Sequence, residues 1–217
     1  MNATLSSILS FSIIIAAALS LVKCRRVSSV YYPFLFFIWL GLINETISFF
    51  IIHSGYSNAV NGNIYALCES LLIVWQFKKW GLFKHWKYLF AFLLFSLIIF
   101  WIIEGFFINQ INYFISYFRI YYSFITVLMS VHIINAQLLN EKKNILKNPA
   151  FLISISFLIY FSYKVIIWSF WIYGLSISKE FALALTAILF YINLFTNLLY
   201  AVAILWIPNR HRFLLQY

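Results

Sequence analysis

The stretch NGNIYALCESLLIVWQF, residues 61–77, is followed at once by Lys78, Lys79 and Trp80. Its length and apolar composition predict a helix that crosses a membrane, with the carboxylate of Glu69 well inside it. An isolated charge is costly at that depth, so another group of the protein must solvate Glu69. Three further charged side chains lie at similar depth in neighbouring hydrophobic segments. This shared level is the main indication of function in the sequence.

The composition places the whole chain in a membrane. Of 217 residues, 65% are hydrophobic and only 9% are charged, a balance that excludes a water-soluble domain of this size. Hydrophobic segments follow one another from residue 5 to residue 207, and the longest polar break covers residues 135–148. We therefore predict one integral membrane domain over residues 1–217, with the lipid bilayer as its main partner. Aspartate is absent, which excludes mechanisms that need an aspartate.

The hydrophobic segments predict an all-α fold, a bundle of seven transmembrane helices. Each segment has close to the roughly 20 residues that cross a bilayer. Pro33 and Pro149 suit the first turn of two helices, and Pro208 ends the last one. The expected helices cover residues 5–22, 33–52, 61–77, 88–108, 113–134, 149–173 and 181–207.

Basic residues are concentrated in every second connection of this bundle. Twelve of the fifteen Lys and Arg residues follow the first, third, fifth and seventh segments, and the other connections carry almost none. By the positive-inside rule, this alternation predicts an outer amino terminus and an inner carboxyl terminus. The residues are Lys23, Arg25, Arg26, Lys78, Lys79, Lys84, Lys87, Lys142, Lys143, Lys147, Arg210 and Arg212.

Segments one to three and five to seven share this orientation, which permits a duplicated three-helix unit joined by segment four, a 3+1+3 arrangement. Segments two and six both open with proline and close with similar runs, SFFII from Ser48 and SFWIY from Ser169. Chance similarity between helices rich in Phe and Ile is the alternative explanation of these runs, and both interpretations stay open.

The intramembrane charges occupy the outer half of the predicted bundle. With a rise of about 1.5 Å per residue, Glu45 lies roughly 12 Å from the outer end of its helix, Glu69 roughly 9 Å, Arg119 roughly 10 Å and Lys164 roughly 15 Å. Glu104, at the outer end of segment four, could reach the same level. The near-neutral balance of acids and bases predicts mutual pairing, although the sequence does not tell which acid meets which base.

Uncharged polar side chains share helix faces with these charges. Helical spacing groups Tyr65 with Glu69, Arg119 with Tyr122, and Tyr160 with Lys164. One interpretation is interhelical hydrogen bonding that only holds the bundle together. The other is a cavity, open outward, that binds a small polar or zwitterionic ligand or a lipid headgroup. The candidate ligand-binding residues are Glu45, Glu69, Arg119, Lys164, Asn44, Tyr65, Tyr122, Tyr160, Asn193 and Asn197.

The sequence predicts no catalytic residue, metal site or cofactor. Lys164 could in principle hold retinal, but rhodopsins carry that lysine on the seventh helix, where this chain has none. No Gly-rich phosphate loop, nucleophile elbow or HExxH motif is present. The net charge of +10 does not indicate nucleic acid, because the basic residues are dispersed over short loops. Cys24 and Cys68 are expected to be free thiols.

The run NxNIYxLxExLL, residues 61–72, resembles a pattern of uncharacterised bacterial seven-helix membrane proteins. The resemblance implies a multi-pass protein of the bacterial inner membrane and brings no function with it. Seven crossings with an outer amino terminus also look like the SWEET sugar transporters, built as three plus one plus three helices. Their Pro-Gln signature is missing from the first segment.

The leading functional interpretation is an outward-facing, ligand-binding membrane protein that acts as a sensor or receptor. Its inner loops are too small for catalysis, so it would report to a protein partner at the inner face. The alternative is a transporter of a small polar solute, for which the possible duplication and the polar face with Asn193 and Asn197 argue. A third interpretation is a lipid-modifying enzyme that uses Glu69 or Glu45 as acid or base.

Overall fold

The computed structural model describes residues 9–24, 27–108, 111–140, 144–173 and 179–208, and within these ranges the chain is helical, without a β-strand. Pro33 and Pro149 each lie in the first turn of a helix, as expected from the sequence. The α-helices are α2 (Ile13–Lys23), α3 (Tyr32–His53), α4 (Ala59–Lys79), α5 (Lys87–Ile102), α6 (Ser116–Asn140), α7 (Pro149–Tyr173) and α8 (Lys179–Trp206). The shorter elements are η1 (Ser29–Tyr31), the π-helical turn η2 (Ile103–Ile108) and η3 (Ile145–Lys147).

Five stretches of helix are long and apolar enough to cross a membrane, which indicates a multi-pass membrane protein. They are Ser29–His53, Tyr88–Ile108, Ser116–Leu139, Pro149–Ile172 and Leu183–Trp206. Helix α4 has the length, at 21 residues, but its asparagines, Glu69 and terminal lysines make it less apolar. Helix α2 has 11 residues.

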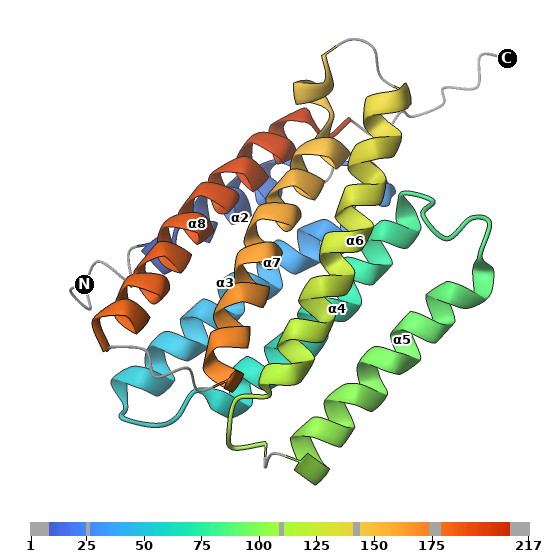
Figure 1. Cartoon of the computed structure of the whole chain (residues 1–217). Coiled ribbons are helices and arrows are strands. Elements are labelled where there is room, and N and C mark those ends of the chain that lie inside the picture. Colours follow the sequence, from blue (N-terminus) through green and yellow to red (C-terminus); the bar gives the residue numbers. More distant parts are fainter. Residues whose placement is uncertain (1–8, 25–26, 109–110, 141–143, 174–178, 209–217) are drawn as a thin grey trace, which may run out of the picture.

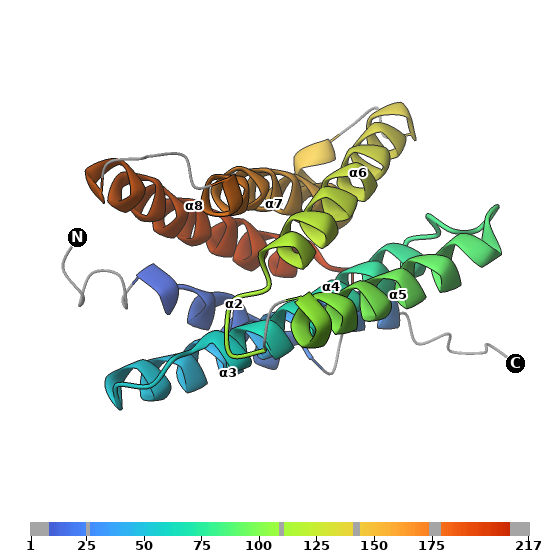
Figure 2. The ribbon, with the colours of Figure 1, turned by 60° about the horizontal axis from the view of Figure 1, so that its bottom comes forward.

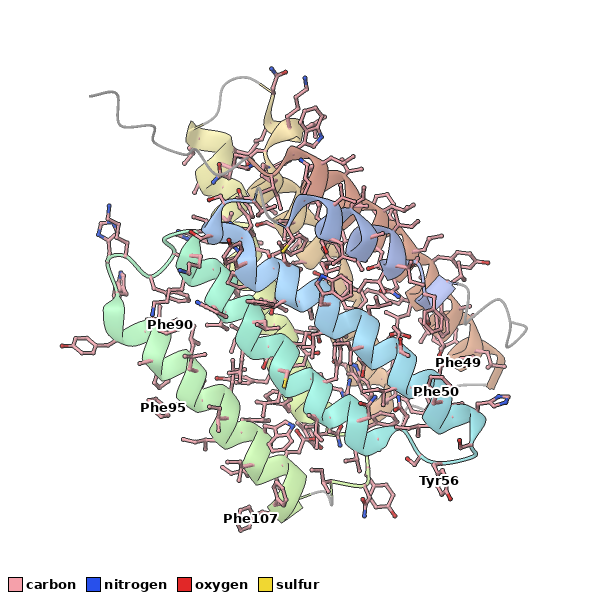
Figure 3. All side chains as sticks on the ribbon, turned by 180° about the vertical axis from the view of Figure 1, so that it is seen from behind. Phe49, Phe50, Tyr56, Phe90, Phe95 and Phe107 are labelled. Atoms are coloured by element: carbon pink, nitrogen blue, oxygen red, sulfur yellow. The ribbon has the colours of Figure 1, made fainter. Side chains whose placement is uncertain are left out.

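Large apolar side chains cover the outside of the bundle, as a lipid environment requires. Phe95 on α5 and Phe107 on η2 are exposed, as are Phe49 and Phe50 near the end of α3 (Figure 3). In water a surface of this kind would be an aggregation hazard, whereas in a bilayer it contacts acyl chains. The outer surface therefore agrees with the composition of the sequence.

The largest differences between predicted and observed helix boundaries are in three segments. Helix α6 runs to Asn140 and not to residue 134, so the polar break before α7 is shorter than expected. The predicted helix 88–108 is α-helical only to Ile102 and continues as the π-helical η2. In the first segment, Phe11 and Ser12 form a turn, so α2 begins only at Ile13. Residues 5–8 of that segment lie outside the described residues.

The helices form two layers (Figure 2). Helices α2, α3, α4 and α5 lie in one layer and α6, α7 and α8 in the other, with α5 at the rim beside α4 (Figures 1 and 2). Helix α2 packs against α8, and α4 against α6, so these pairs join the layers. Fully buried aromatic side chains fill the space between them, chiefly Phe34, Phe77, Phe118, Phe157 and Phe161.

Successive helices run in opposite directions, and the basic connections meet at one end of the bundle (Figure 1). There the Lys23 ammonium donates to the carbonyl of Leu205, the Ser28 N–H donates to the carbonyl of Pro208 at 3.3 Å, and Lys147 lies 5.1 Å from the Trp206 ring centre. We call this the basic end. The loop after α3 and the start of α6 lie at the other end, which we call the opposite end. The alternation of basic connections in the sequence therefore corresponds to two ends of one bundle.

Candidate functional site

Glu69 on α4 is the centre of a buried polar network. Its side chain is 1% exposed, and its carboxylate accepts hydrogen bonds from two other helices as well as its own. Oε1 accepts from the Tyr65 hydroxyl at 2.9 Å. Oε2 accepts from the Lys164 ammonium of α7 at 2.9 Å and from the Tyr122 hydroxyl of α6. The network therefore joins α4, α6 and α7 at one level.

Lys164 has no need of a ligand to balance its charge. Besides Glu69, its Nζ donates to the Tyr122 hydroxyl at 2.6 Å. It also lies 5.1 Å from each of the ring centres of Tyr122, Tyr160 and Phe161, a distance at which a cation is attracted to a ring. Hydrogen bonding between helices therefore accounts for this pair of charges without a ligand.

Arg119 on α6 is buried apart from this pair. Its Nη2 donates to the carbonyl of Gly62 at 2.7 Å, and its guanidinium lies 4.8 Å from the Trp168 ring centre and 5.3 Å from that of Phe114. Gly62 permits this close approach, since an added Cβ would lie 3.1 Å from Nη2. Within the described part of the chain, Arg119 forms no ion pair with a carboxylate.

Glu104 caps a helix. Its Oε1 accepts the backbone N–H of Tyr117 at 2.9 Å and its Oε2 that of Phe118, both in the first turn of α6. Those N–H groups have no partner within the helix, and a negative charge near a helix N-terminus is favourable. Glu104 therefore orients α6 from the end of the preceding hydrophobic segment.

A small cavity lies beside this network, between the two layers. Its volume is about 50 Å³, room for a few water-sized groups and well below the roughly 300 Å³ at which drug-sized pockets begin. Its walls come from Ser10 and from α2, α3, α4, α7 and α8, and Glu69 and Tyr160 place it near the middle of α4 and α7. The lining residues are Ser10, Ile13, Phe37, Gly41, Glu45, Tyr65, Glu69, Tyr160, Asn193, Thr196, Asn197 and Tyr200.

Six of the ten candidate residues line this cavity: Glu45, Glu69, Tyr65, Tyr160, Asn193 and Asn197. Lys164 and Tyr122 are connected to it through Glu69. Arg119 and Asn44 do not line it, and Asn44 instead accepts a hydrogen bond from Asn61 at 3.0 Å. Of the four charges expected to pair, only Glu69 and Lys164 form an ion pair within the described residues.

Several lining residues are not among the ten candidates from the sequence, among them Ser10, Thr196 and Tyr200. Tyr200 is seven residues after Asn193 and Thr196 precedes Asn197, so the polar face of the last helix was the available signal. Ser10 lies just before the turn that precedes α2, and its hydroxyl hydrogen-bonds Glu45. No spacing in the sequence links Ser10 to Glu45.

Two further polar side chains have structural roles. Gln76 accepts the N–H of Phe34 at 2.9 Å and donates to the carbonyl of Val30 at 3.0 Å, which ties α4 to the start of α3. Asn63 donates to the carbonyls of Ile111 and Tyr113 at 3.0 and 2.7 Å, which holds the chain before α6. These contacts position the helices around the cavity without taking part in it.

The arrangement can hold a small polar guest between acids and tyrosines. Across the described ranges, no three His, Cys, Asp or Glu side chains are grouped so that they could hold a metal ion. The chain matches no protein-family model, no curated protein and no solved structure.

Proposed function

We propose that the chain is a ligand-binding sensor or receptor of the cell membrane, with the basic end inside and a cavity that takes its ligand from the outer side. In this proposal α2 and α4 cross the membrane as well, which gives seven crossings. A small polar ligand enters the cavity and shifts the helices around it, and a protein partner at the inner face receives the change. The orientation follows from the positive-inside rule applied to the lysines at the basic end.

The observation that carries this proposal is a cavity lined by two carboxylates inside an otherwise apolar bundle. Hydrogen bonding between helices accounts for Glu69, Lys164 and Tyr122, and Asn197 donates to the Ser12 hydroxyl at 2.8 Å. These contacts still leave a space with Glu45 and Asn193 on its wall. If the polar residues served only to hold the helices together, apolar side chains would be expected to fill this space, because native interiors are closely packed. The polar space is therefore best explained by a guest.

A cluster of aromatic rings closes the cavity toward the basic end. Phe34 and Tyr200 have ring centres 5.5 Å apart, and Phe157 lies 5.9 Å from Tyr200. Phe34 and Phe157 are fully buried. Helix α3 starts at the basic end, and Phe34 lies closer to that start than Phe37, the first residue of α3 that lines the cavity. A guest cannot pass these rings without a rearrangement, which favours sensing over free conduction.

The test is stabilisation of the purified protein by small polar solutes. A solute that binds the folded state raises the unfolding temperature in a saturable way. We expect such a rise in the wild-type protein and its loss in Asn193→Leu, which removes a polar group from the cavity wall. Asn44→Leu is the matched control, because Asn44 lies outside the cavity and this variant should keep the response. The proposal fails if no small solute stabilises the wild type.

Transport of a small polar solute is the second candidate function. It is favoured by the position of the cavity between the layer of α2, α3 and α4 and the layer of α6, α7 and α8, since rocking of two such units is a common route to alternating access. Uptake into protein-containing vesicles that disappears in Asn193→Ala would place transport first. A sensor should show no uptake.

A further inference from the structure

The described titratable carboxyl groups on the wall of the cavity are Glu45 and Glu69, and only Glu69 is paired with a cation of the protein. Glu45 and Glu69 line the cavity, whereas Lys164 and Arg119 do not. Glu69 is paired with Lys164 at 2.9 Å. Within the described ranges Glu45 has no ion-pair partner. Its side chain hydrogen-bonds the Ser10 hydroxyl, which carries no charge. The cavity therefore presents to its guest one carboxyl group that has no cationic partner among the described residues.

The rest of the wall suits an organic cation better than a metal ion. Four aromatic side chains line the cavity: Phe37, Tyr65, Tyr160 and Tyr200. Aromatic rings attract ammonium groups, and rings combined with a carboxylate are a recurrent way to bind them. Glu45 and Glu69 are two carboxylates on this wall, and the described residues hold no group of three His, Cys, Asp or Glu side chains for a metal ion. The chemistry of the wall thus points to an ammonium group.

The volume limits the size of this guest. One water-sized group occupies roughly 10–15 Å³ of cavity volume, so a cavity of 50 Å³ accommodates about four heavy atoms. Asn193 and Asn197 add amide groups to the wall that can accept hydrogen bonds from an N–H donor. A larger quaternary ammonium ion does not fit without movement of the helices.

We propose that the guest is a small primary ammonium ion and that the carboxylate of Glu45 is its counter-ion. This inference rests on the proposed function, since it names the class of ligand that the cavity takes. It also revises the expectation of a zwitterionic ligand. A zwitterion needs a cation for its acidic group, and Arg119 and Lys164 are engaged elsewhere.

The experiment compares solutes of matched size on the purified protein in lipid nanodiscs, with the unfolding temperature as the readout. Propylammonium chloride is the probe. Propanol is its neutral counterpart, glycine is a zwitterion of similar size, tetraethylammonium is a cation too large for the cavity, and sodium chloride controls for ionic strength. We expect a saturable rise with propylammonium alone. This comparison in the wild-type protein needs no variant.

Glu45→Gln tests the counter-ion, because it keeps the shape of the side chain and removes its charge. A hydrogen bond to a charged group is worth about 1.5–3 kcal/mol, so the variant should weaken the apparent affinity for propylammonium about tenfold to a hundredfold. The control is Thr46→Val on the same helix, because the Thr46 hydroxyl donates to the carbonyl of Leu42 and does not line the cavity. Thr46→Val should bind as the wild type does.

The outcomes separate this inference from the proposed function. Stabilisation by propanol or glycine equal to that by propylammonium would overturn the ammonium assignment and leave a ligand-binding cavity in place. Unchanged propylammonium affinity in Glu45→Gln would overturn the role of Glu45. Stabilisation by tetraethylammonium at a similar concentration would refute the size limit. If none of these solutes acts and no other small polar solute does, both proposals fail.

Discussion

At the scale of single residues, the buried ion pair between Glu69 and Lys164 gives the most direct test of the site. Replacing Lys164 with methionine keeps the length of the side chain but leaves the Glu69 carboxylate buried without its cation. Removing one partner of a buried pair costs about 3–5 kcal/mol. We therefore expect Lys164→Met to lower the free energy of unfolding by about 3 kcal/mol, measured by denaturation in detergent micelles.

The double variant Glu69→Gln/Lys164→Met is the matched control for this effect. It removes both charges, so no uncompensated carboxylate is left in the interior, and it should be more stable than Lys164→Met alone. A single variant that unfolds at the same denaturant concentration as the wild type would contradict the burial of the pair.

The hydroxyl of Tyr122 is expected to contribute more to the free energy of unfolding than the hydroxyl of its neighbour Tyr121. Tyr122 donates to Glu69 and accepts from Lys164, both buried, whereas the half-buried Tyr121 donates to Ser96 at 3.0 Å. Tyr122→Phe leaves a buried acceptor and donor short of a partner, at a cost of about 2 kcal/mol, while Tyr121→Phe should cost less than about 1 kcal/mol. Unfolding titrations of both variants measure the difference. Equal losses of stability in the two variants would contradict a larger contribution from the Tyr122 hydroxyl.

At this scale the sequence indicated the level of the charges but not their partners. Depth follows from counting residues along a helix, and that count brought Glu45, Glu69 and Lys164 to one region of the bundle. Pairing depends on helix rotation and neighbour order, which apolar segments with little periodicity do not encode. Lys164 therefore meets Glu69 through α7, while Arg119 is placed against Gly62 and Trp168.

At the scale of helices, the Glu104 carboxylate is expected to protect the first turn of α6. It accepts the backbone N–H groups of Tyr117 and Phe118. Glu104→Ala removes this cap and should cost about 1–2 kcal/mol of stability. The local signature is faster hydrogen exchange at Tyr117 and Phe118, with the centre of α6 unchanged. Exchange that rises uniformly over α6, or not at all, would be inconsistent with a cap.

The helix boundaries show which local signals can be read. Pro33 and Pro149 mark the starts of α3 and α7 to within one residue, because proline suits the first turn and is excluded from helix interiors. Helix α6 continues past its apolar part through Ala136, Gln137 and Leu138, since these residues favour a helix even where they leave the membrane core. The π-helical η2 has no comparable signal, because it depends on contacts such as that between Glu104 and α6.

At the scale of the whole molecule, the distribution of charge was the most informative feature of the sequence. The alternation of basic connections predicted two unlike ends, and Lys23 and Lys147, from two of these connections, do lie at one end of the bundle. The two-layer packing was not predictable in the same way, because it depends on the fit of buried aromatic side chains such as Phe77 and Phe157. The 3+1+3 duplication stays a prediction, although α5 does lie at the rim beside α4.

The orientation in the membrane can be tested with the native cysteines. Cys24 is exposed at the basic end, and Cys68 lies within α4. In a Cys68→Ala background, a membrane-impermeant maleimide should modify Cys24 only after the cells are permeabilised, because the positive-inside rule puts the basic end in the cytoplasm. Tyr56→Cys in a Cys24→Ala/Cys68→Ala background should react in intact cells, since Tyr56 is exposed in the loop after α3 at the opposite end.

Labelling at the two positions also tests whether α3 crosses the membrane. An odd number of crossings separates Cys24 from Tyr56 only if α3 spans the bilayer, so labelling of both positions from one side would contradict α3 as a membrane helix. Labelling of Cys24 in intact cells and of Tyr56→Cys only after permeabilisation would reverse the orientation. The cavity, which we propose to take its ligand from the side of the opposite end, would then open toward the cytoplasm, and the ammonium ion that we propose would be an intracellular one.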